Sequence, residues 1–233
     1  LPSLGHTTYQ KLKDAYYTAA KGLLDAKSDA LLVETTQDLL QAKAAVNGCR
    51  QAIAEVDFDV VLIAQVTVET TGTMLLGSEI GAALNALEPL EVDLIGLNCA
   101  TGPAEMSEHL RYLSKFANCA ISVMPNAGLP ILGANGAEYP LGPKELADAL
   151  ETFVGDYGIG LIGGCCGTTP EHLAAVVEKM SGKPFKERGA ALDPGASSLY
   201  QYVPFRQDNT YLAIGERTNA NGSRAFRDAL VAE

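Results

Sequence analysis

A chain of 233 residues, 47% of them hydrophobic, can bury the core of one large domain or of two modest ones. Its formal net charge of -11 at pH 7 argues against a surface for nucleic acids or anionic membranes, because either would need clustered lysine and arginine. The apolar runs are strand-sized, so we identify no transmembrane helix and no secretory signal and expect a cytoplasmic protein.

Segments with helical spacing of apolar residues alternate with short apolar runs along most of the chain. The first helical face is predicted from Leu12, Tyr16, Ala19 and Leu23. In chain order, the predicted strands cover residues 29–34, 58–66, 92–99 and 120–124, and a last run that ends at Cys165. Such continuously apolar strands are typical of a parallel sheet whose two faces are covered. A doubly wound sheet and a (β/α)8 barrel both fit this alternation.

Polar residues at the ends of the strands favour the barrel. Glu34, Cys99, Asn126, Cys165 and Cys166 all end or follow apolar runs. In a barrel the carboxyl ends of all strands meet around one axis, whereas distant strands of an open sheet do not converge. We therefore predict an α/β chain with a (β/α)8 TIM-type barrel. Because five strands do not close an eight-stranded barrel, we expect it to be N-terminally incomplete, with about three strands upstream or absent.

The character of the sequence changes after about Met180. Residues 183–210 are rich in Gly, Pro, Ser and charged residues without periodicity, which predicts a linker between domains. Residues 211–219 then have the pattern of a new strand, and residues 222–231 that of the helix after it. We predict three parts: a barrel over 1–182, a linker over 183–210, and the start of a second α/β barrel over 211–233.

The stretch GGCCG around Cys165 and Cys166 places two thiols where a strand must become irregular. Adjacent residues of a regular strand point to opposite faces, so the two sulfurs can converge only where the backbone departs from that geometry. Glycine permits such a departure. Three glycines flank the pair, at Gly163, Gly164 and Gly167.

A helix is predicted directly behind the pair. It should begin at Pro170, with Thr168 or Thr169 as its cap. The partial positive charge of its N-terminus is expected to favour thiolates. We expect Cys99 at the same edge of the sheet, because it ends another apolar run.

Three converging cysteines suggest a zinc site with an open position. Structural zinc sites use four protein ligands, whereas catalytic sites use three and keep one for water or substrate. Three thiolates suit the alkylation of a bound thiol better than hydrolysis, since they leave the site with a net charge of about -1. A buried small hydrophobe or a redox pair is the alternative for Cys165 and Cys166. Cys49 and Cys119 are interpreted as core residues, and an odd total of five cysteines does not fit a disulfide framework.

Three motifs carry a resemblance to a known family. GLNCATGP, MPNAGLP and GGCCGTTPEH, in this order, resemble the homocysteine-binding zinc barrel of the homocysteine S-methyltransferases. The later stretch GERTNANGS resembles the opening of the pterin-binding domain of its cobalamin-dependent members. The resemblance covers nearly the whole chain. It implies Zn²⁺ bound by Cys99, Cys165 and Cys166, with the thiolate of homocysteine as the fourth ligand.

The resemblance also implies roles for other residues. Glu34, in LLVET, is expected to help hold the amino group of homocysteine. Asn126, in PNAG, is a candidate substrate-binding residue or a turn residue that supports the site. Glu216 and Asn219 are expected to contact the pterin, or they shape a strand-to-helix turn. In the complete protein, methylcobalamin would methylate homocysteine to methionine, and 5-methyltetrahydrofolate would recharge the cobalamin.

Some parts of the family pattern do not occur in this sequence. The Asp-Gly-Ala-Met-Gly-Thr type motif of the first strand is missing, and so is the cobalamin-binding domain, which would be a partner of this chain. We therefore expect an incomplete fragment of the enzyme. One alternative is a cobalamin-independent methyltransferase that uses betaine or S-methylmethionine, against which the GERTN segment argues. A non-catalytic zinc-binding or redox protein is the alternative from a different class.

Overall fold

The computed structural model describes residues 1–133, 136–209, 211 and 219–232. Helices and strands alternate along most of these residues, as predicted. The main elements are α1 (Tyr9–Asp25), β1 (Ala30–Thr36), α2 (Leu39–Ile53), β2 (Val61–Val66), α3 (Ile80–Leu87), β3 (Leu94–Asn98), α4 (Pro103–Phe116), β4 (Ala120–Met124), α5 (Pro143–Tyr157), β7 (Leu161–Ile162) and α6 (Pro170–Met180). Smaller elements are the 3-10 helices η1 (Pro2–Leu4) and η2 (Glu88–Leu90), the hairpins β5 (Ile131–Gly133) with β6 (Gly136–Glu138) and β8 (Gly195–Ser197) with β9 (Tyr202–Pro204), and α7 (Arg224–Val231).

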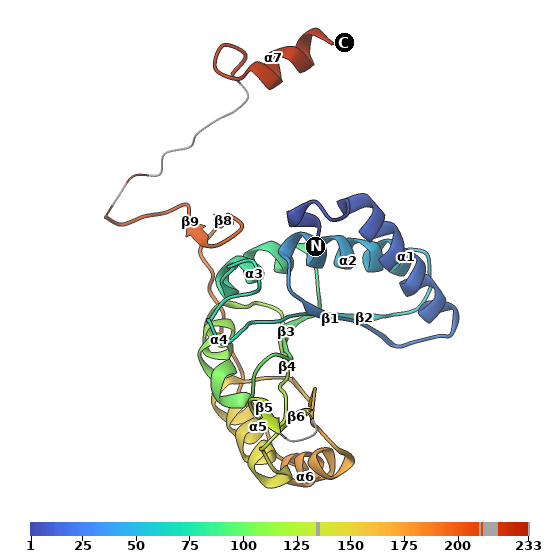
Figure 1. The fold of residues 1–233 in the computed structure, drawn as a ribbon, viewed down its shortest axis with the longest axis vertical. Coiled ribbons are helices and arrows are strands. Elements are labelled where there is room, and N and C mark those ends of the chain that lie inside the picture. Colours follow the sequence, from blue (N-terminus) through green and yellow to red (C-terminus); the bar gives the residue numbers. More distant parts are fainter. Residues whose placement is uncertain (134–135, 210, 212–218, 233) are drawn as a thin grey trace.

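Five parallel strands form one sheet in the order β1-β2-β3-β4-β7. The strands follow an arc, and the helices lie on its outer side (Figure 1). The prediction of a parallel α/β sheet is therefore confirmed. A closed barrel is not formed by the described residues, since β1 and β7 remain the two edges of the sheet.

Alternate residues of the central strands build the core. Ile95 and Leu97 of β3 and Ile121 and Val123 of β4 are at most 1% exposed, and they belong to one cluster with apolar residues of the helices. The residues between these core positions point to the inner side of the arc, and Asn98, the last residue of β3, is one of them. The sheet thus separates an apolar outer layer from an inner side that carries polar groups.

The buried face of α1 differs from the predicted one. Leu24 is 2% exposed whereas Leu23 is 53% exposed, so the face is displaced by about one residue. α1 packs against α2, where a Cβ at Gly48 would lie 2.8 Å from the backbone nitrogen of Tyr17. The close approach of α2 decides which side of α1 is covered, and periodicity alone could not choose between two adjacent leucines.

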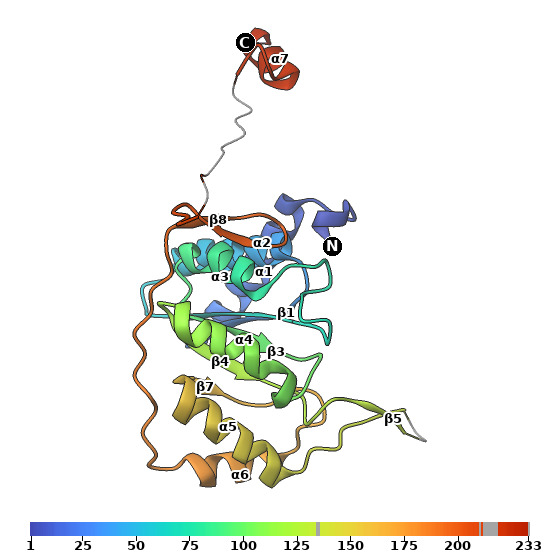
Figure 2. The same cartoon turned by 90° about the vertical axis from the view of Figure 1, so that its left-hand side faces the viewer.

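Residues 183–205, which we call the strap, lie within the predicted linker but contact the folded sheet and helices. Figure 2 shows the strap passing from α6 along one side of the molecule to the hairpin β8–β9. Arg188 anchors its first half: Nη1 donates to the carbonyl of Ala117 at 2.9 Å, and Nη2 donates to the carbonyl of Cys119 at 2.5 Å.

The hairpin of the strap is bound to α3 and the loop before it. Ser78 Oγ donates to the carbonyl of Leu199 at 2.5 Å, and Asn85 Nδ2 donates to Ser197 Oγ at 2.9 Å. Through these contacts the strap packs against the sheet and helices that precede it. The predicted domain boundaries at residues 182 and 210 stay predictions. The predicted strand over 211–219 lies largely outside the described residues, and a second barrel is not shown. In the described part of the chain, no helix is long and apolar enough to cross a membrane.

Candidate metal centre

Three thiols lie together where β3 and β7 end. Cys99 directly follows β3, and Cys165 and Cys166 follow β7 after two glycines. The Sγ atom of Cys166 lies 3.8 Å from Cys99 Sγ and 4.0 Å from Cys165 Sγ. All three sulfurs lie within 4.8 Å of one another. A tetrahedron with Zn–S bonds of about 2.3 Å separates its sulfurs by about 3.8 Å, so the spacing fits three ligands of one zinc ion.

The thiol cluster stands out among the described residues. No other group of three or more His, Cys, Asp or Glu side chains there brings its ligand atoms together in this way. Cys49 is buried in the core, and burial raises the pKa of its thiol to about 11. Burial and the nearby Glu88 raise the pKa of the Cys119 thiol to about 12. Neither belongs to the cluster, which agrees with their interpretation as core residues.

The backbone leaves regular strand geometry at Cys99. Cys99 and Ala100 have φ angles of 63° and 60°. A non-glycine residue in this left-handed region costs about 1–3 kcal/mol, so neighbouring contacts must hold it there. The N–H of Cys99 donates to the carbonyl of Met124 at 3.2 Å, and its carbonyl accepts the N–H of Thr101 at 2.8 Å. The end of β4 therefore fixes the first thiol.

The glycines around the cysteine pair act in two ways. Gly167 has a φ of 77°, which few other residues adopt, and a Cβ there would overlap the side chain of Tyr139. Gly164 has no such angle, but a Cβ there would overlap the side chain of Thr168. Glycine is thus needed at Gly167 for its backbone conformation, as predicted, and at Gly164 because it leaves space for the side chain of Thr168.

Asn126 connects the two thiol-bearing loops. Its Oδ1 accepts the N–H of Cys166 at 3.1 Å, and its own N–H donates to the carbonyl of Thr101 at 3.0 Å. The N–H of Cys165 donates to the carbonyl of Pro125 at 2.8 Å. Asn126 is 2% exposed. These contacts fit a residue that supports the site, and its predicted contact with substrate stays a prediction.

Helix α6 begins behind the cysteine pair as predicted, at Pro170 with Thr169 as its N-cap. The N–H of Thr169 donates to Nδ1 of His172 at 3.2 Å, and His172 Nε2 lies 2.9 Å from the carbonyl oxygen of Leu141. Because Nδ1 accepts, Nε2 carries the proton and donates to that carbonyl. Both nitrogens of His172 are therefore engaged in holding the helix start.

Burial opposes ionisation of two of the thiols. Burial, and then the charge of Cys99, raises the pKa of Cys165 to about 12, and burial raises the pKa of Cys99. These effects outweigh the positive end of α6, which we expected to favour thiolates. A divalent cation reverses the balance, because it binds thiolates directly and compensates their repulsion. The donor set therefore fits a cation site better than a reactive redox pair with low pKa values.

The predicted substrate residue Glu34 lies on the same inner side. It is an exposed residue near the end of β1, and Nδ2 of Asn98 lies 3.4 Å from its Oε2 atom. Asn98 also lies beside a thiol, 3.9 Å from Cys165 Sγ. Sequence reasoning missed Asn98. Its signal was a polar residue at the inner, alternating position of an otherwise apolar strand, next to a candidate ligand.

The two predicted pterin contacts are only partly described. Glu216 lies outside the described residues. Asn219 is exposed, and its carbonyl accepts the N–H groups of Gly222 and Ser223 at 3.1 and 2.8 Å. Its Oδ1 accepts the N–H of Asn221 at 2.9 Å. Asn219 thus shapes the turn before α7, and its pterin contact stays a prediction.

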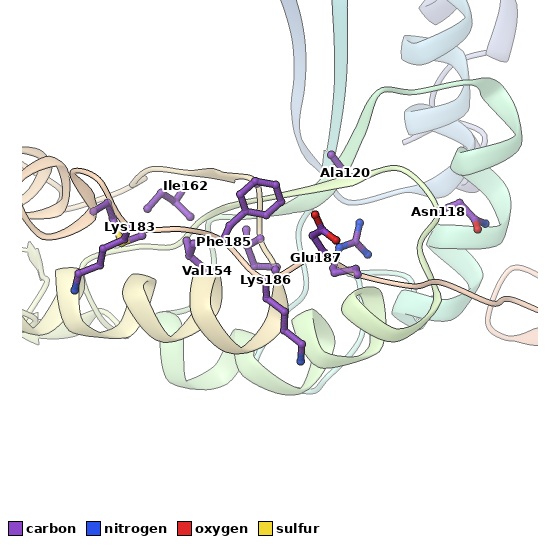
Figure 3. A pocket seen from close by; sticks show the side chains of 13 residues that line it. Asn118, Ala120, Val154, Ile162, Lys183, Phe185, Lys186 and Glu187 are labelled. Carbon is purple, nitrogen blue, oxygen red and sulfur yellow. The ribbon is translucent and has the colours of Figure 1, made fainter.

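The cavity of about 690 Å³ shown in Figure 3 lies away from the thiols. Its lining includes Ala120 and Gly160, at the amino-terminal ends of β4 and β7, and Phe185 of the strap. The thiols lie at the opposite, carboxyl-terminal ends of the strands. Two of its basic residues already have partners within the protein: Lys183 forms an ion pair with Glu151, and Lys186 Nζ donates to the backbone carbonyl of Asp156. The cavity is therefore not part of the metal centre.

Comparisons with solved structures agree with the fold. The homocysteine methyltransferase MmuM from Escherichia coli, in its apo form, superposes with a TM-score of 0.60 at 22% identity, over 75% of this chain and 58% of that chain. Its metallated form gives a TM-score of 0.56 at 23% identity, over 72% and 52%. At these identities the likeness shows the α/β fold alone.

Sequence comparisons identify the family. The methionine synthase of Mycobacterium tuberculosis is 61% identical over 233 residues, which are 100% of this chain and 20% of that protein. The methionine synthase of Mycobacterium leprae is 61% identical over 238 residues, with the same two shares. The chain thus spans about one fifth of the length of these relatives. The family model described as homocysteine S-methyltransferase matches residues 2–180. The chain belongs to the homocysteine S-methyltransferase family.

Proposed function

We propose that this chain is part of a methionine synthase and that its thiol cluster binds zinc and homocysteine. The observation that carries the proposal is the mutual spacing of the sulfurs of Cys99, Cys165 and Cys166, which fits three corners of a zinc tetrahedron. Family membership and the identity to two methionine synthases support it. Three protein ligands would leave one position for the thiol of homocysteine, whose sulfur would accept the methyl group of methylcobalamin to form methionine and leave the cobalamin demethylated.

Bound zinc would supply one chemical function, the stabilisation of the homocysteine thiol as a nucleophilic thiolate at neutral pH. The protein's own residues would supply position. The backbone contacts of Cys99 and Asn126 fix the three sulfurs before substrate arrives. Glu34 is proposed to bind the ammonium group of homocysteine, since its carboxylate is exposed on the inner side of the sheet near Cys165.

The remaining parts of the cycle are proposed for the complete protein. Methylcobalamin would be held by a separate domain and would deliver the methyl group. The domain that begins near residue 211 would bind 5-methyltetrahydrofolate, with contacts from Glu216 and Asn219. We also propose that the protein works in the cytoplasm, where thiols of this kind stay reduced.

The other candidate functions are less well supported. A betaine or S-methylmethionine donor is not favoured, because the two methionine synthases match the chain over its whole length, including residues 183–233. A redox role for Cys165 and Cys166 is less well supported, because the sulfur of a third residue, Cys99, lies 3.8 Å from Cys166 Sγ in the same cluster.

The test combines metal analysis with substitution. We expect one zinc per chain in the wild type and in Cys49→Ala, a matched control whose thiol lies in the core. Cys165→Ser should lose zinc and homocysteine binding together. Zinc K-edge X-ray absorption should change from three sulfurs and one light atom to four sulfurs when homocysteine is added. Folded wild-type protein without zinc, or a fourth protein ligand that closes the site, would contradict the proposal.

A further inference from the structure

Asn98 contacts the metal centre and the candidate substrate carboxylate at the same time. It ends the central strand β3 and is 0% exposed. Its Oδ1 accepts the N–H of Thr35 at 2.8 Å, and its Nδ2 donates to Thr35 Oγ1 at 2.7 Å. The same Nδ2 lies 3.4 Å from Glu34 Oε2 and 3.9 Å from Cys165 Sγ.

The side-chain amide of Asn98 has more neighbouring acceptors than N–H groups to donate. An Asn NH2 group offers two N–H bonds, and three acceptors surround it here. The hydroxyl of Thr35 takes one N–H at a short distance, which leaves the second N–H between the Glu34 carboxylate and the Cys165 sulfur. β1 and β7 are the two edges of the sheet, so this one side chain links residues from both edges.

The side-chain oxygen of Asn98 also holds an irregular position near the end of β1. Thr35 has a φ of 54°, and the register between β1 and β2 shifts between Val33 and Thr36. A left-handed conformation is unfavourable for a β-branched residue, so it persists only when contacts enforce it. The Oδ1 atom of Asn98 receives the N–H of this strained residue. Loss of the amide would release Thr35 and with it the adjacent Glu34.

We propose that Asn98 is a positioning residue that sets the distance between the Glu34 carboxylate and the thiol cluster, and so selects a thiol ligand that carries an ammonium group. This role rests on the proposed function of the site. Asn98 supplies none of the three sulfurs, so zinc binding should survive its removal. Recognition of the amino group should suffer instead, because the carboxylate would no longer be fixed relative to the sulfur position.

The experiment compares two thiols on the zinc-loaded protein by calorimetry: homocysteine, and 4-mercaptobutyrate, which lacks the amino group. For Asn98→Ala we expect one zinc per chain and homocysteine affinity about tenfold lower, the loss of about one good hydrogen bond. Affinity for 4-mercaptobutyrate should change less than about threefold. Asn47→Ala is the matched control, since Asn47 Nδ2 donates to the hydroxyl of Tyr9.

If Asn98→Ala does not fold, Thr35→Gly/Asn98→Ala provides a second variant. Glycine adopts a φ of 54° without strain, so the turn needs less support, while the Asn98 donor is still missing. Equal loss for both thiols, or homocysteine affinity within threefold of wild type, would overturn the positioning role while the proposed function stands. A wild-type protein that binds neither zinc nor homocysteine would overturn the proposed function, and the role of Asn98 with it.

Discussion

Arg188→Ala should weaken the attachment of the strap to α4 and to the residues between α4 and β4, and lower the free energy of unfolding. The guanidinium of Arg188 donates to the carbonyls of Ala117 and Cys119 at 2.9 and 2.5 Å, and more distantly to two carbonyls in the last turn of α4. Hydrogen bonds from a charged donor contribute about 1.5–3 kcal/mol each, and the carbonyls it leaves behind regain water only in part. We therefore expect a loss of about 2–4 kcal/mol.

For a domain of this size, such a loss lowers the melting temperature by about 5–15 °C. Thermal and urea unfolding of the purified chain would measure it. Arg188→Lys should recover part of the loss, because it keeps the charge but not the two-pronged geometry. Arg224→Ala is the control, since the exposed pair of Arg224 with Asp228 should contribute less than about 0.5 kcal/mol. A melting temperature of Arg188→Ala within about 2 °C of that of Arg224→Ala would refute the anchoring role.

Two further substitutions test the packing and the electrostatics. Gly155→Ala in α5 should raise the free energy of unfolding by about 0.5–1 kcal/mol, because nothing lies within 4 Å of the new Cβ. Gly96→Ala should abolish soluble expression, because its Cβ would overlap the backbone of Ser122. Soluble Gly96→Ala protein with the same urea midpoint as Gly155→Ala would contradict this. Lys144 and Lys179 lower the pKa of Asp148 to about 2, so the stability that this carboxylate contributes is present above its unfolded pKa of about 4 and is lost as pH falls towards 2. Asp148→Asn should therefore be less stable than wild type at pH 6 and approach it at pH 2 in urea unfolding, and a constant difference across this range would argue against the pairing.

Patterns of local origin predicted the sheet and the thiol cluster. Each strand is a short, nearly continuous apolar run that the local sequence shows by itself, so strands around residues 94–98 and 120–124 could be located without tertiary information. The convergence of Cys165 and Cys166 could be predicted because adjacent thiols at a strand end, flanked by glycines, lie where the strand geometry must break. The start of α6 at Pro170 followed from capping residues that lie next to one another in the sequence.

Features that depend on distant partners could not be predicted. The strap had no periodicity, because its order comes from single polar residues such as Arg188 and Ser197 that bind groups about 70 and 110 residues away. The hairpin of β5 and β6 has strands of three residues each, too short to produce an alternating pattern. The side of α1 that is buried was decided by α2, and for this reason the predicted face was displaced towards Leu23.

The thiol cluster shows the same division between candidate reacting groups and supporting groups. Sulfur ligands are recognisable because zinc chemistry restricts them to few residue types, but the groups that hold them are ordinary amides. Asn126 receives the N–H of Cys166, and Asn98 receives the N–H of Thr35 while its Nδ2 faces Cys165. Each amide brings a main-chain N–H and a thiol-bearing loop into a fixed relation. Asn126 thus supports the spacing of the sulfurs, whereas Asn98 sets the position of Glu34 relative to them, and substitution of Asn98 should alter ligand selection before it alters metal content.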